Sequence, residues 1–204
     1  INEQGLSFDL LYFPGLAQYQ TYNTNTASKA MPYYQISDYL LGNFSNIDEI
    51  KQALPTLNVY AKPLEHAGQA VVFPVHYVVT DKNGRSIAIE YVDGKLNVYD
   101  NTTGILTNSP AYPWQTTNLN NYVNLSPHAP SPVIKDGVTY NATGQGGGAV
   151  GLPGDYTPPS RFIRTAYLVS TAKRTDDAST TVNLAEHILN NVDIPYGAIR
   201  GPKG

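Results

Sequence analysis

The segment from residue 71 to residue 99 limits the possible folds most, because three runs of alternating apolar residues follow one another in it. The runs read VVFPVHYVVT, SIAIEYV and KLNVY, and they are separated by DKNGR and by Asp93-Gly94. An Asp-Gly pair between two such runs is typical of a tight β-hairpin. We therefore predict an antiparallel meander over residues 71–99.

Apolar spacing and capping residues predict the elements on either side of this meander. The expected elements are a strand over residues 6–12, helices over 33–41 and 46–54, a short strand over 105–107, and helices over 160–174 and 182–192. Residues 112–157 are rich in Asn, Pro and Gly, and their periodicity is too weak for long elements. Helices that flank an antiparallel sheet indicate an α+β fold.

Composition excludes several classes of protein. The 204 residues are 41% hydrophobic, which is enough for a substantial core and favours a single domain. Only 14% of the residues are charged and the net charge is -3, so a nucleic-acid partner is not expected. No apolar run approaches the roughly 20 residues that span a bilayer, so we expect no membrane segment.

A glycine-rich stretch, GQGGGAVGLPGDYTPPSRF, places Gly146, Gly148 and Gly151 in a G-x-G-x-x-G pattern. A dinucleotide site needs a helix that begins at this pattern, and the LPG that follows cannot open one. We therefore predict a tight structural loop and no nucleotide cofactor. Asp155 is expected to tie down the backbone of this loop through local hydrogen bonds.

The ionisable residues give little sign of a metal centre or a triad. The chain has no cysteine, and its four histidines, at 66, 76, 128 and 187, lack partners at metal-ligand spacing, so each is expected to be structural and no metal is expected. Glu90 ends an apolar triplet in the meander. We expect it on the solvent side of its strand, with a buried acid as the alternative.

Two polar residues stand at places where chemistry is possible. Asn108, in TNSP, follows a predicted strand, and a side-chain amide there can donate to a developing oxyanion or simply cap a turn. Arg161 follows Pro158-Pro159-Ser160 at a helix start, where the helix dipole disfavours a cation. Local pattern alone favours an arginine with no special role, and a specific group that holds Arg161 is the alternative.

Three long motifs together resemble the choloylglycine hydrolase family, which contains bile salt hydrolases and penicillin V acylases. They are INEQGL, ILTNSPAYPWQTTNLNNYVNLSP and GQGGGAVGLPGDYTPPSRFIRTAYL, with DKNGRSIAIEY and NLAEHILNNVDIP in the matching order. The resemblance implies a four-layer αββα N-terminal-nucleophile hydrolase, usually a homotetramer. It also implies a cysteine nucleophile at the mature N-terminus, whose α-amine takes the thiol proton before a thioester forms.

The resemblance assigns roles to three residues of this chain. Asn108 matches the oxyanion-hole asparagine, and Arg161 matches the arginine near the nucleophile, where a cation favours the thiolate. Tyr12, in LLYFPG, matches a position lining the oxyanion hole that tends to be Asn in bile salt hydrolases and Tyr in penicillin V acylases. Tyr12 therefore favours penicillin V as the small-molecule amide substrate. Conjugated bile salts are the alternative, and acyl-homoserine lactones are a third possibility.

One departure from the family pattern is the absence of cysteine. Ile1 matches a position downstream of the nucleophile. We therefore expect residues 1–204 to be the central portion of a single domain, without its N-terminal nucleophile segment and its C-terminal end. The competing hypothesis is a catalytically silent chain that binds or assembles. For the compartment of the protein, the sequence leaves both the bacterial cytoplasm and the periplasm as alternatives.

Overall fold

The computed structural model describes residues 1–201, and its contacts divide the chain into two compact units. Unit 1 is Ile1–Trp114 and unit 2 is Gln115–Gly204. Each unit is described by itself below. That both belong to a single domain over residues 1–204 stays a prediction.

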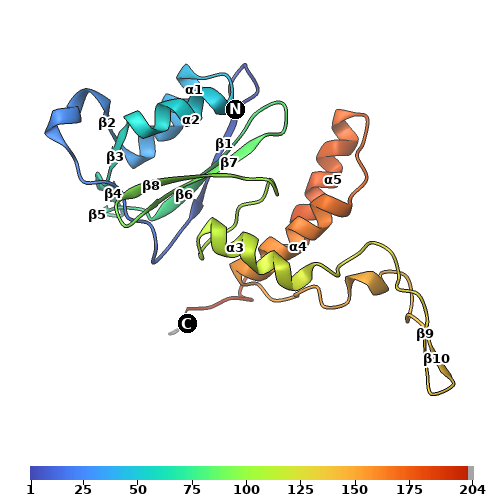
Figure 1. The fold of residues 1–204 in the computed structure, drawn as a ribbon. Coiled ribbons are helices and arrows are strands. Elements are labelled where there is room, and N and C mark those ends of the chain that lie inside the picture. The colour runs from blue at the N-terminus through green and yellow to red at the C-terminus, as the bar shows by residue number, and fades with distance from the viewer. Residues whose placement is uncertain (202–204) are drawn as a thin grey trace. The chain divides into compact units, whose positions relative to one another are not determined.

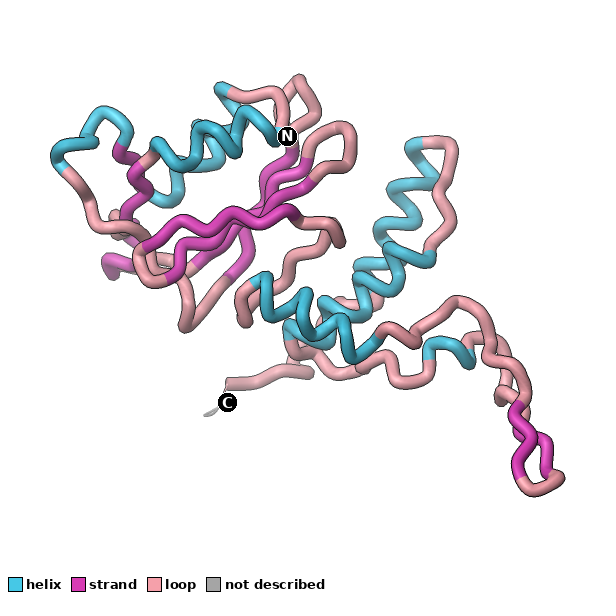
Figure 2. Tube along the Cα trace, in the orientation of Figure 1, coloured by secondary structure: helices cyan, strands magenta, loops and turns pink. Residues whose placement is uncertain are grey.

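Figures 1 and 2 show the helices and strands of both units. In unit 1 these are β1 (Ser7–Tyr12), β2 (Ala30–Pro32), α1 (Ile36–Asn43), α2 (Ile47–Ala53), β3 (Asn58–Tyr60), β4 (Leu64–His66), β5 (Gln69–Val71), β6 (Val75–Thr80), β7 (Ser86–Val92) and β8 (Lys95–Asp100). Then follow α3 (Tyr112–Asn118), β9 (Val133–Lys135), β10 (Val138–Tyr140), α4 (Pro158–Thr171) and α5 (Ala178–Asn190). Among the residues that the structure describes, no helix is long and apolar enough to cross a membrane.

A four-stranded antiparallel sheet with the order β1-β6-β7-β8 forms the centre of unit 1. The predicted meander is confirmed as β6, β7 and β8. Its second turn has positive φ angles at Asp93 (51°) and Gly94 (69°), as the Asp-Gly signal requires. The predicted first strand is confirmed as β1, which pairs with β6.

One face of this sheet carries the core of unit 1. Figure 1 shows α1 and α2 lying along that face. Ile36, Leu40 and Ile50 are fully buried there against strand residues such as Val79 and Ile87. The sequence predicted both helices, and side chains hold the start of α2: Asn46 at the N-cap accepts from the Glu49 amide through Oδ1 (3.1 Å), and Glu49 Oε2 accepts from the Ser45 amide just before the N-cap (2.7 Å).

The predicted strand over residues 105–107 is wrong, because this segment pairs with no strand. Its backbone groups bond to side chains instead. The Ile105 amide donates to Thr103 Oγ1 (3.2 Å), and the Thr107 carbonyl oxygen lies 2.7 Å from His76 Nε2. A short apolar run is therefore compatible with an ordered non-strand segment when side chains meet its hydrogen-bonding needs.

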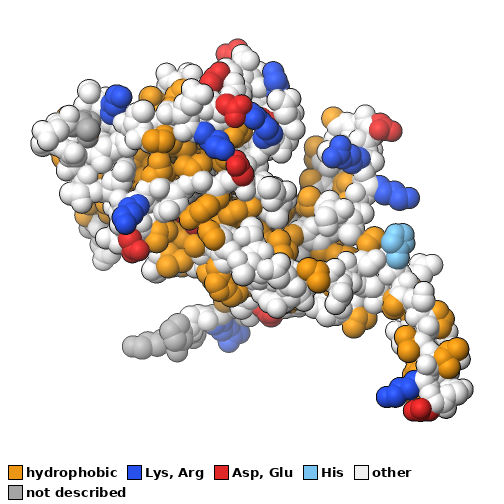
Figure 3. Space-filling view, viewed as in Figure 1, with side chains coloured by type: hydrophobic (Ala, Val, Ile, Leu, Met, Phe, Trp, Pro, Cys, Tyr) orange, Lys and Arg blue, Asp and Glu red, His pale blue; other side chains and the backbone are white. Residues whose placement is uncertain are grey.

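Unit 2 contains both predicted helices, as α4 and α5, together with a hairpin that the sequence patterns did not predict. In the hairpin, β9 and β10 pair around Asp136 (φ 51°) and Gly137 (φ 78°), the same dipeptide signal as in the meander. Four of its apolar side chains are exposed, namely those of Val133, Ile134, Val138 and Tyr140. Hydrophobic side chains accordingly mark this hairpin in Figure 3.

Candidate active site

Two of the predicted site residues, Tyr12 and Asn108, lie together in unit 1. Asn108 Nδ2 donates to the backbone carbonyl of Tyr12 at 2.6 Å, at the end of β1. The next residue makes a parallel contact, because Ser109 Oγ donates to the Pro14 carbonyl at 2.7 Å. Residues 107–112, which we call the corner, are thus tied to a segment more than 90 positions earlier in the chain.

A buried acid–imidazole pair lies under the corner. His76 and Glu90 are both 0% exposed, and His76 Nδ1 is 3.0 Å from Glu90 Oε1. The expectation that Glu90 faces solvent is therefore wrong, and the buried alternative is right. The physical reason is pairing: the register that joins Tyr77 to Ile89 places His76 opposite Glu90, so the imidazole bonds to Glu90 Oε1, although Glu90 Oε2 has no hydrogen-bond partner among the described residues. Sequence reasoning considered the two residues one at a time and missed this.

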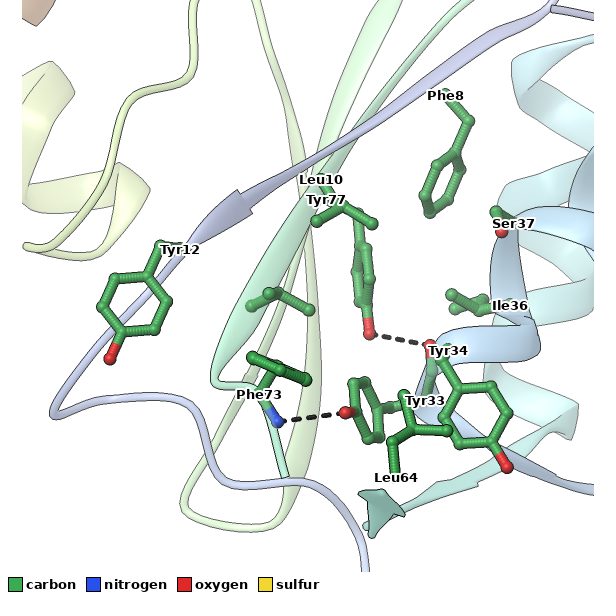
Figure 4. A pocket seen from close by; sticks show the side chains of 11 residues that line it. Phe8, Leu10, Tyr12, Tyr33, Tyr34, Ile36, Ser37, Leu64, Phe73 and Tyr77 are labelled. Atoms are coloured by element: carbon green, nitrogen blue, oxygen red, sulfur yellow. Dashed lines mark hydrogen bonds between the residues drawn. The ribbon is translucent and has the colours of Figure 1, made fainter. Parts of the chain in front are cut away.

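An apolar pocket of about 350 Å³ opens beside Tyr12 in unit 1. Figure 4 shows side chains from β1, β6 and the start of α1 around it. Its lining consists of Phe8, Leu10, Tyr12, Tyr33, Tyr34, Ile36, Ser37, Leu64, Phe73, Val75 and Tyr77. The Tyr12 side chain, which is 55% exposed, lies at the edge of this set.

Hydrogen bonds hold the aromatic wall of the pocket in place. The Tyr77 hydroxyl donates to the Tyr33 carbonyl (3.0 Å), and the Tyr33 hydroxyl accepts from the Phe73 amide (3.0 Å). Burial raises the pKa of Tyr77 far above its ordinary value, so its hydroxyl stays protonated. The pocket therefore presents a fixed apolar surface, because the hydroxyls of Tyr33 and Tyr77 already have hydrogen-bond partners.

Arg161, the third predicted site residue, lies in the first turn of α4 in unit 2. Its Nε donates to the Tyr156 carbonyl at 3.2 Å. Burial, and then the neighbouring charge of Arg164, lower the pKa of Arg161. An arginine keeps its proton at neutral pH despite such a shift, so Arg161 is a half-buried cation.

The loop before α4 is held by its own side chains, as the sequence predicted for Asp155. Asp155 Oδ1 accepts from the Thr157 amide (2.9 Å), and Oδ2 accepts from Ser160 Oγ (2.6 Å). The hydrogen bonds from Ser160 and then Thr157 lower the pKa of Asp155 to about 2. These bonds tie the loop to the first turn of α4, the turn that carries Arg161.

Arg164 and Gly148 explain the rest of this loop. The Arg164 guanidinium donates to the carbonyls of Pro153 (2.8 Å), Asp155 (2.7 Å) and Asn191 (3.1 Å). A Cβ at Gly148 would lie 2.1 Å from the His128 carbonyl oxygen, so this position requires glycine. The loop therefore has structural reasons for its glycines, in agreement with the predicted tight structural loop.

The structure thus brings Asn108 and Tyr12 together, and it places Arg161 in the other unit, so its proximity to them stays a prediction. Among residues 1–201, no group of three or more His, Asp or Glu side chains is arranged to hold a metal ion. What unit 1 offers chemically is a positioned amide, bonded to the backbone of Tyr12, and an apolar pocket that the same Tyr12 helps to line.

Comparison with known proteins places this chain in a family. The profile described as linear amide C-N hydrolases, choloylglycine hydrolase family, matches residues 1–204. The bile salt hydrolase/transferase of Clostridium perfringens is 39% identical over 98% of this chain, and the match covers 60% of that protein. A solved variant of the conjugated bile acid hydrolase from the same species superposes with a TM-score of 0.86, at 36% identity over 100% of this chain and 61% of the other.

The penicillin V acylase of Pectobacterium atrosepticum is a more distant relative, 26% identical over 97% of this chain and 50% of its own length. The chain spans about 60% of the length of the bile salt hydrolases that it matches. The structural match confirms the α+β fold of the N-terminal-nucleophile hydrolases. On the profile match and the identity across nearly its whole length, this chain belongs to the choloylglycine hydrolase family of linear amide C-N hydrolases.

Proposed function

We propose that the protein carrying this chain hydrolyses the amide bond of conjugated bile salts. One observation carries the proposal: identity is 39% and 35% to two bile salt hydrolases/transferases and 26% to the penicillin V acylase. The preference for penicillin V expected from Tyr12 is therefore not favoured, and the alternative substrate becomes the main one.

The apolar pocket supports a large acyl group. Its volume of about 350 Å³ lies in the range of pockets that bind drug-sized ligands, roughly 300–1,000 Å³. Aromatic side chains from Tyr33, Phe73 and Tyr77 form much of its wall. A fused-ring steroid acid is rigid and apolar and would bury much of its surface on such a wall, whereas a phenoxyacetyl group has a single ring.

In the proposed reaction, a cysteine thiolate attacks the amide carbon, the amine leaves, and water releases the acid from the thioester. The chain has no cysteine, so its contribution is the groups around the nucleophile. Asn108 would donate to the developing oxyanion, and Arg161 would favour the thiolate. Tyr12 would line the acyl side of the site. Assembly into a homotetramer also stays a prediction.

Penicillin V is the second candidate substrate, and only Tyr12 favours it. The structure weakens this argument, because the hydrogen bond from Asn108 reaches the backbone carbonyl of residue 12, which any residue would supply. A tyrosine side chain at the pocket edge is compatible with either acyl group.

The substrate test compares the full-length natural protein on glycine- and taurine-conjugated bile salts and on penicillin V. We expect a higher kcat/KM on a bile conjugate, measured by release of the free amino acid. A higher kcat/KM on penicillin V, measured by release of 6-aminopenicillanate, would restore the interpretation of Tyr12. If the protein turns over neither substrate, the result supports the competing hypothesis of a catalytically silent chain that binds or assembles.

A pair of neighbouring variants tests the pocket. Ser37→Phe places a ring in the pocket and should raise the KM for a bile conjugate about tenfold or more, because the acyl group loses its space. Asp38→Phe adds the same bulk at the next, exposed position of α1, outside the pocket lining, and should leave KM unchanged. Equal effects of the two variants would contradict this location for the acyl group.

A further inference from the structure

The proposed reaction makes no use of the most deeply buried ionisable pair in unit 1. His76 and Glu90 are 0% exposed and come from adjacent strands, β6 and β7. Burying an acid and an imidazole away from water is costly unless both are paired. The other hydrogen bonds of the pair therefore identify the backbone groups that it holds in place.

The bonds of His76 determine where its protons lie. Nε2 lies 2.7 Å from the Thr107 carbonyl oxygen, which can only accept, so Nε2 carries a proton. Nδ1 faces Glu90 Oε1 at 3.0 Å, so a second proton lies between the acid and the ring. The Phe13 ring stacks on the imidazole with centroids 4.2 Å apart and an interplanar angle of 8°, which fixes the plane of the ring.

Glu90 holds the other end of the corner. Its Oε1 also accepts from the Tyr112 amide at 2.9 Å. The pair therefore bonds to the first residue of the corner through His76 and to the last through Glu90. Asn108 lies between these two anchors, and its own amide reaches Tyr12.

We propose that His76 and Glu90 are positioning residues, which hold the corner at both ends and so keep the Asn108 amide aimed at the oxyanion. This rests on the proposed function, since it assumes the role of Asn108 there. Neither side chain touches the substrate. The other ionisable groups beside Glu90 are Tyr99 of β8 and Tyr112 of α3, whose rings stack with centroids 5.9 Å apart.

A glutamine at position 90 cannot replace the acid, although it has the same shape. With this glutamine and a neutral imidazole, the His76 ring has one N–H for two oxygen partners. If that N–H faces Thr107, the lone pair of Nδ1 faces the amide oxygen that the Tyr112 amide needs. If the glutamine amide is turned over, the Tyr112 amide loses its acceptor. At least one anchor of the corner is lost either way.

The test is Glu90→Gln in the full-length protein, with Tyr91→Phe as the matched control. Tyr91 is the next residue in β7, is also 0% exposed, and its hydroxyl has no hydrogen-bond partner among the described residues. Glu90→Gln should lower kcat on a bile conjugate about tenfold or more while KM changes less than about twofold. Tyr91→Phe should leave kcat unchanged. A KM effect equal to the kcat effect, or an unchanged kcat, would overturn the proposal.

A double-mutant cycle separates positioning from general loss of stability. If Glu90 acts through Asn108, then Glu90→Gln should cause little further loss of kcat in the Asn108→Ala background. If the kcat of the double variant is lowered by the product of the two single losses, the residues act independently and the proposal is overturned. If Glu90→Gln prevents folding, His76→Gln takes its place, because a glutamine there can reach only one of the two oxygens.

Hydrogen exchange distinguishes failure of this inference from failure of the proposed function. The Tyr112 amide should be protected in the natural protein, and its exchange should be about tenfold faster or more in Glu90→Gln, whatever the substrate is. If the Tyr112 amide exchanges at the same rate in Glu90→Gln as in the natural protein, the claim that Glu90 anchors the corner is overturned. Faster exchange in Glu90→Gln, combined with full activity of Asn108→Ala, would instead overturn the role of Asn108.

Discussion

The corner in unit 1 and the loop before α4 in unit 2 each present a predicted site residue, but different chemistry holds them. The corner carries Asn108 and is anchored by a pair that is fully buried. The loop of residues 153–160 precedes Arg161 and is anchored by the exposed carboxylate of Asp155 and by the guanidinium of Arg164. A buried pair fixes geometry at a high cost of disruption, whereas the exposed carboxylate of Asp155 costs less to disrupt and responds to pH.

The largest effect is expected at the corner, from His76→Ala. The variant leaves Glu90 buried without its partner, and removing one member of a buried pair costs about 3–5 kcal/mol. Urea unfolding of the full-length protein should show a free energy of unfolding lowered by about that amount. His66→Ala, at an exposed position of β4, is the control and should change it by less than about 0.5 kcal/mol. If His76→Ala lowers the free energy of unfolding no more than His66→Ala does, the claim that the buried pair anchors the corner is contradicted.

A smaller loss is expected in the loop, from Arg164→Ala. Arg164 is 7% exposed, and its guanidinium bonds to three backbone carbonyls. Losing these charged hydrogen bonds should cost about 2 kcal/mol, since solvent can reach the freed carbonyls of the loop. Arg174→Ala, at an exposed position after α4, should have little effect. A loss at Arg164 above that of His76→Ala would reverse the order that burial predicts.

The smallest effect, and the one that depends on pH, is expected from Asp155→Asn. The pKa of Asp155 is lowered to about 2 from an ordinary 3.8, so the carboxylate stabilises the folded state above about pH 4. That contribution is lost as the pH falls through the interval from 3.8 toward 2. The Tm difference between the natural protein and Asp155→Asn should therefore shrink over this interval. Ser160→Ala removes the largest cause of the lowered pKa and should narrow the interval; a Tm difference independent of pH would contradict this account.

Local patterns in the sequence were sufficient for most of the fold. The meander, the first strand and the helices α1, α2, α4 and α5 all follow from spacing and capping signals. The Asp-Gly pair predicts the turn at residues 93–94, but the same pair at 136–137 is a weak signal because the flanking strands are only three residues long. The segment 105–107 is not a strand because Thr103, two residues before it, and His76, 31 residues before Thr107, meet its backbone hydrogen-bonding needs, and the contact with His76 has no local signal in the sequence.

The candidate site was less accessible than the fold. Asn108, Arg161 and Tyr12 were found by resemblance, since no local pattern distinguishes a turn asparagine from an oxyanion donor. The His76–Glu90 pair was missed because each residue looks ordinary alone. Only the strand register, which sums many contacts along β6 and β7, brings the two side chains together. The Tyr12 backbone contact likewise depends on packing between distant segments.

The most direct measurement of the central claim is the kcat of Asn108→Ala on a taurine-conjugated bile salt in the full-length protein, with Asn120→Ala as the control at an exposed position. We expect kcat to fall about 10²–10³-fold, the usual cost of one oxyanion donor, while the Tm changes by only a few degrees. Asn120→Ala should retain full turnover. A kcat for Asn108→Ala within about twofold of the natural protein, at unchanged stability, would contradict the role given to the corner.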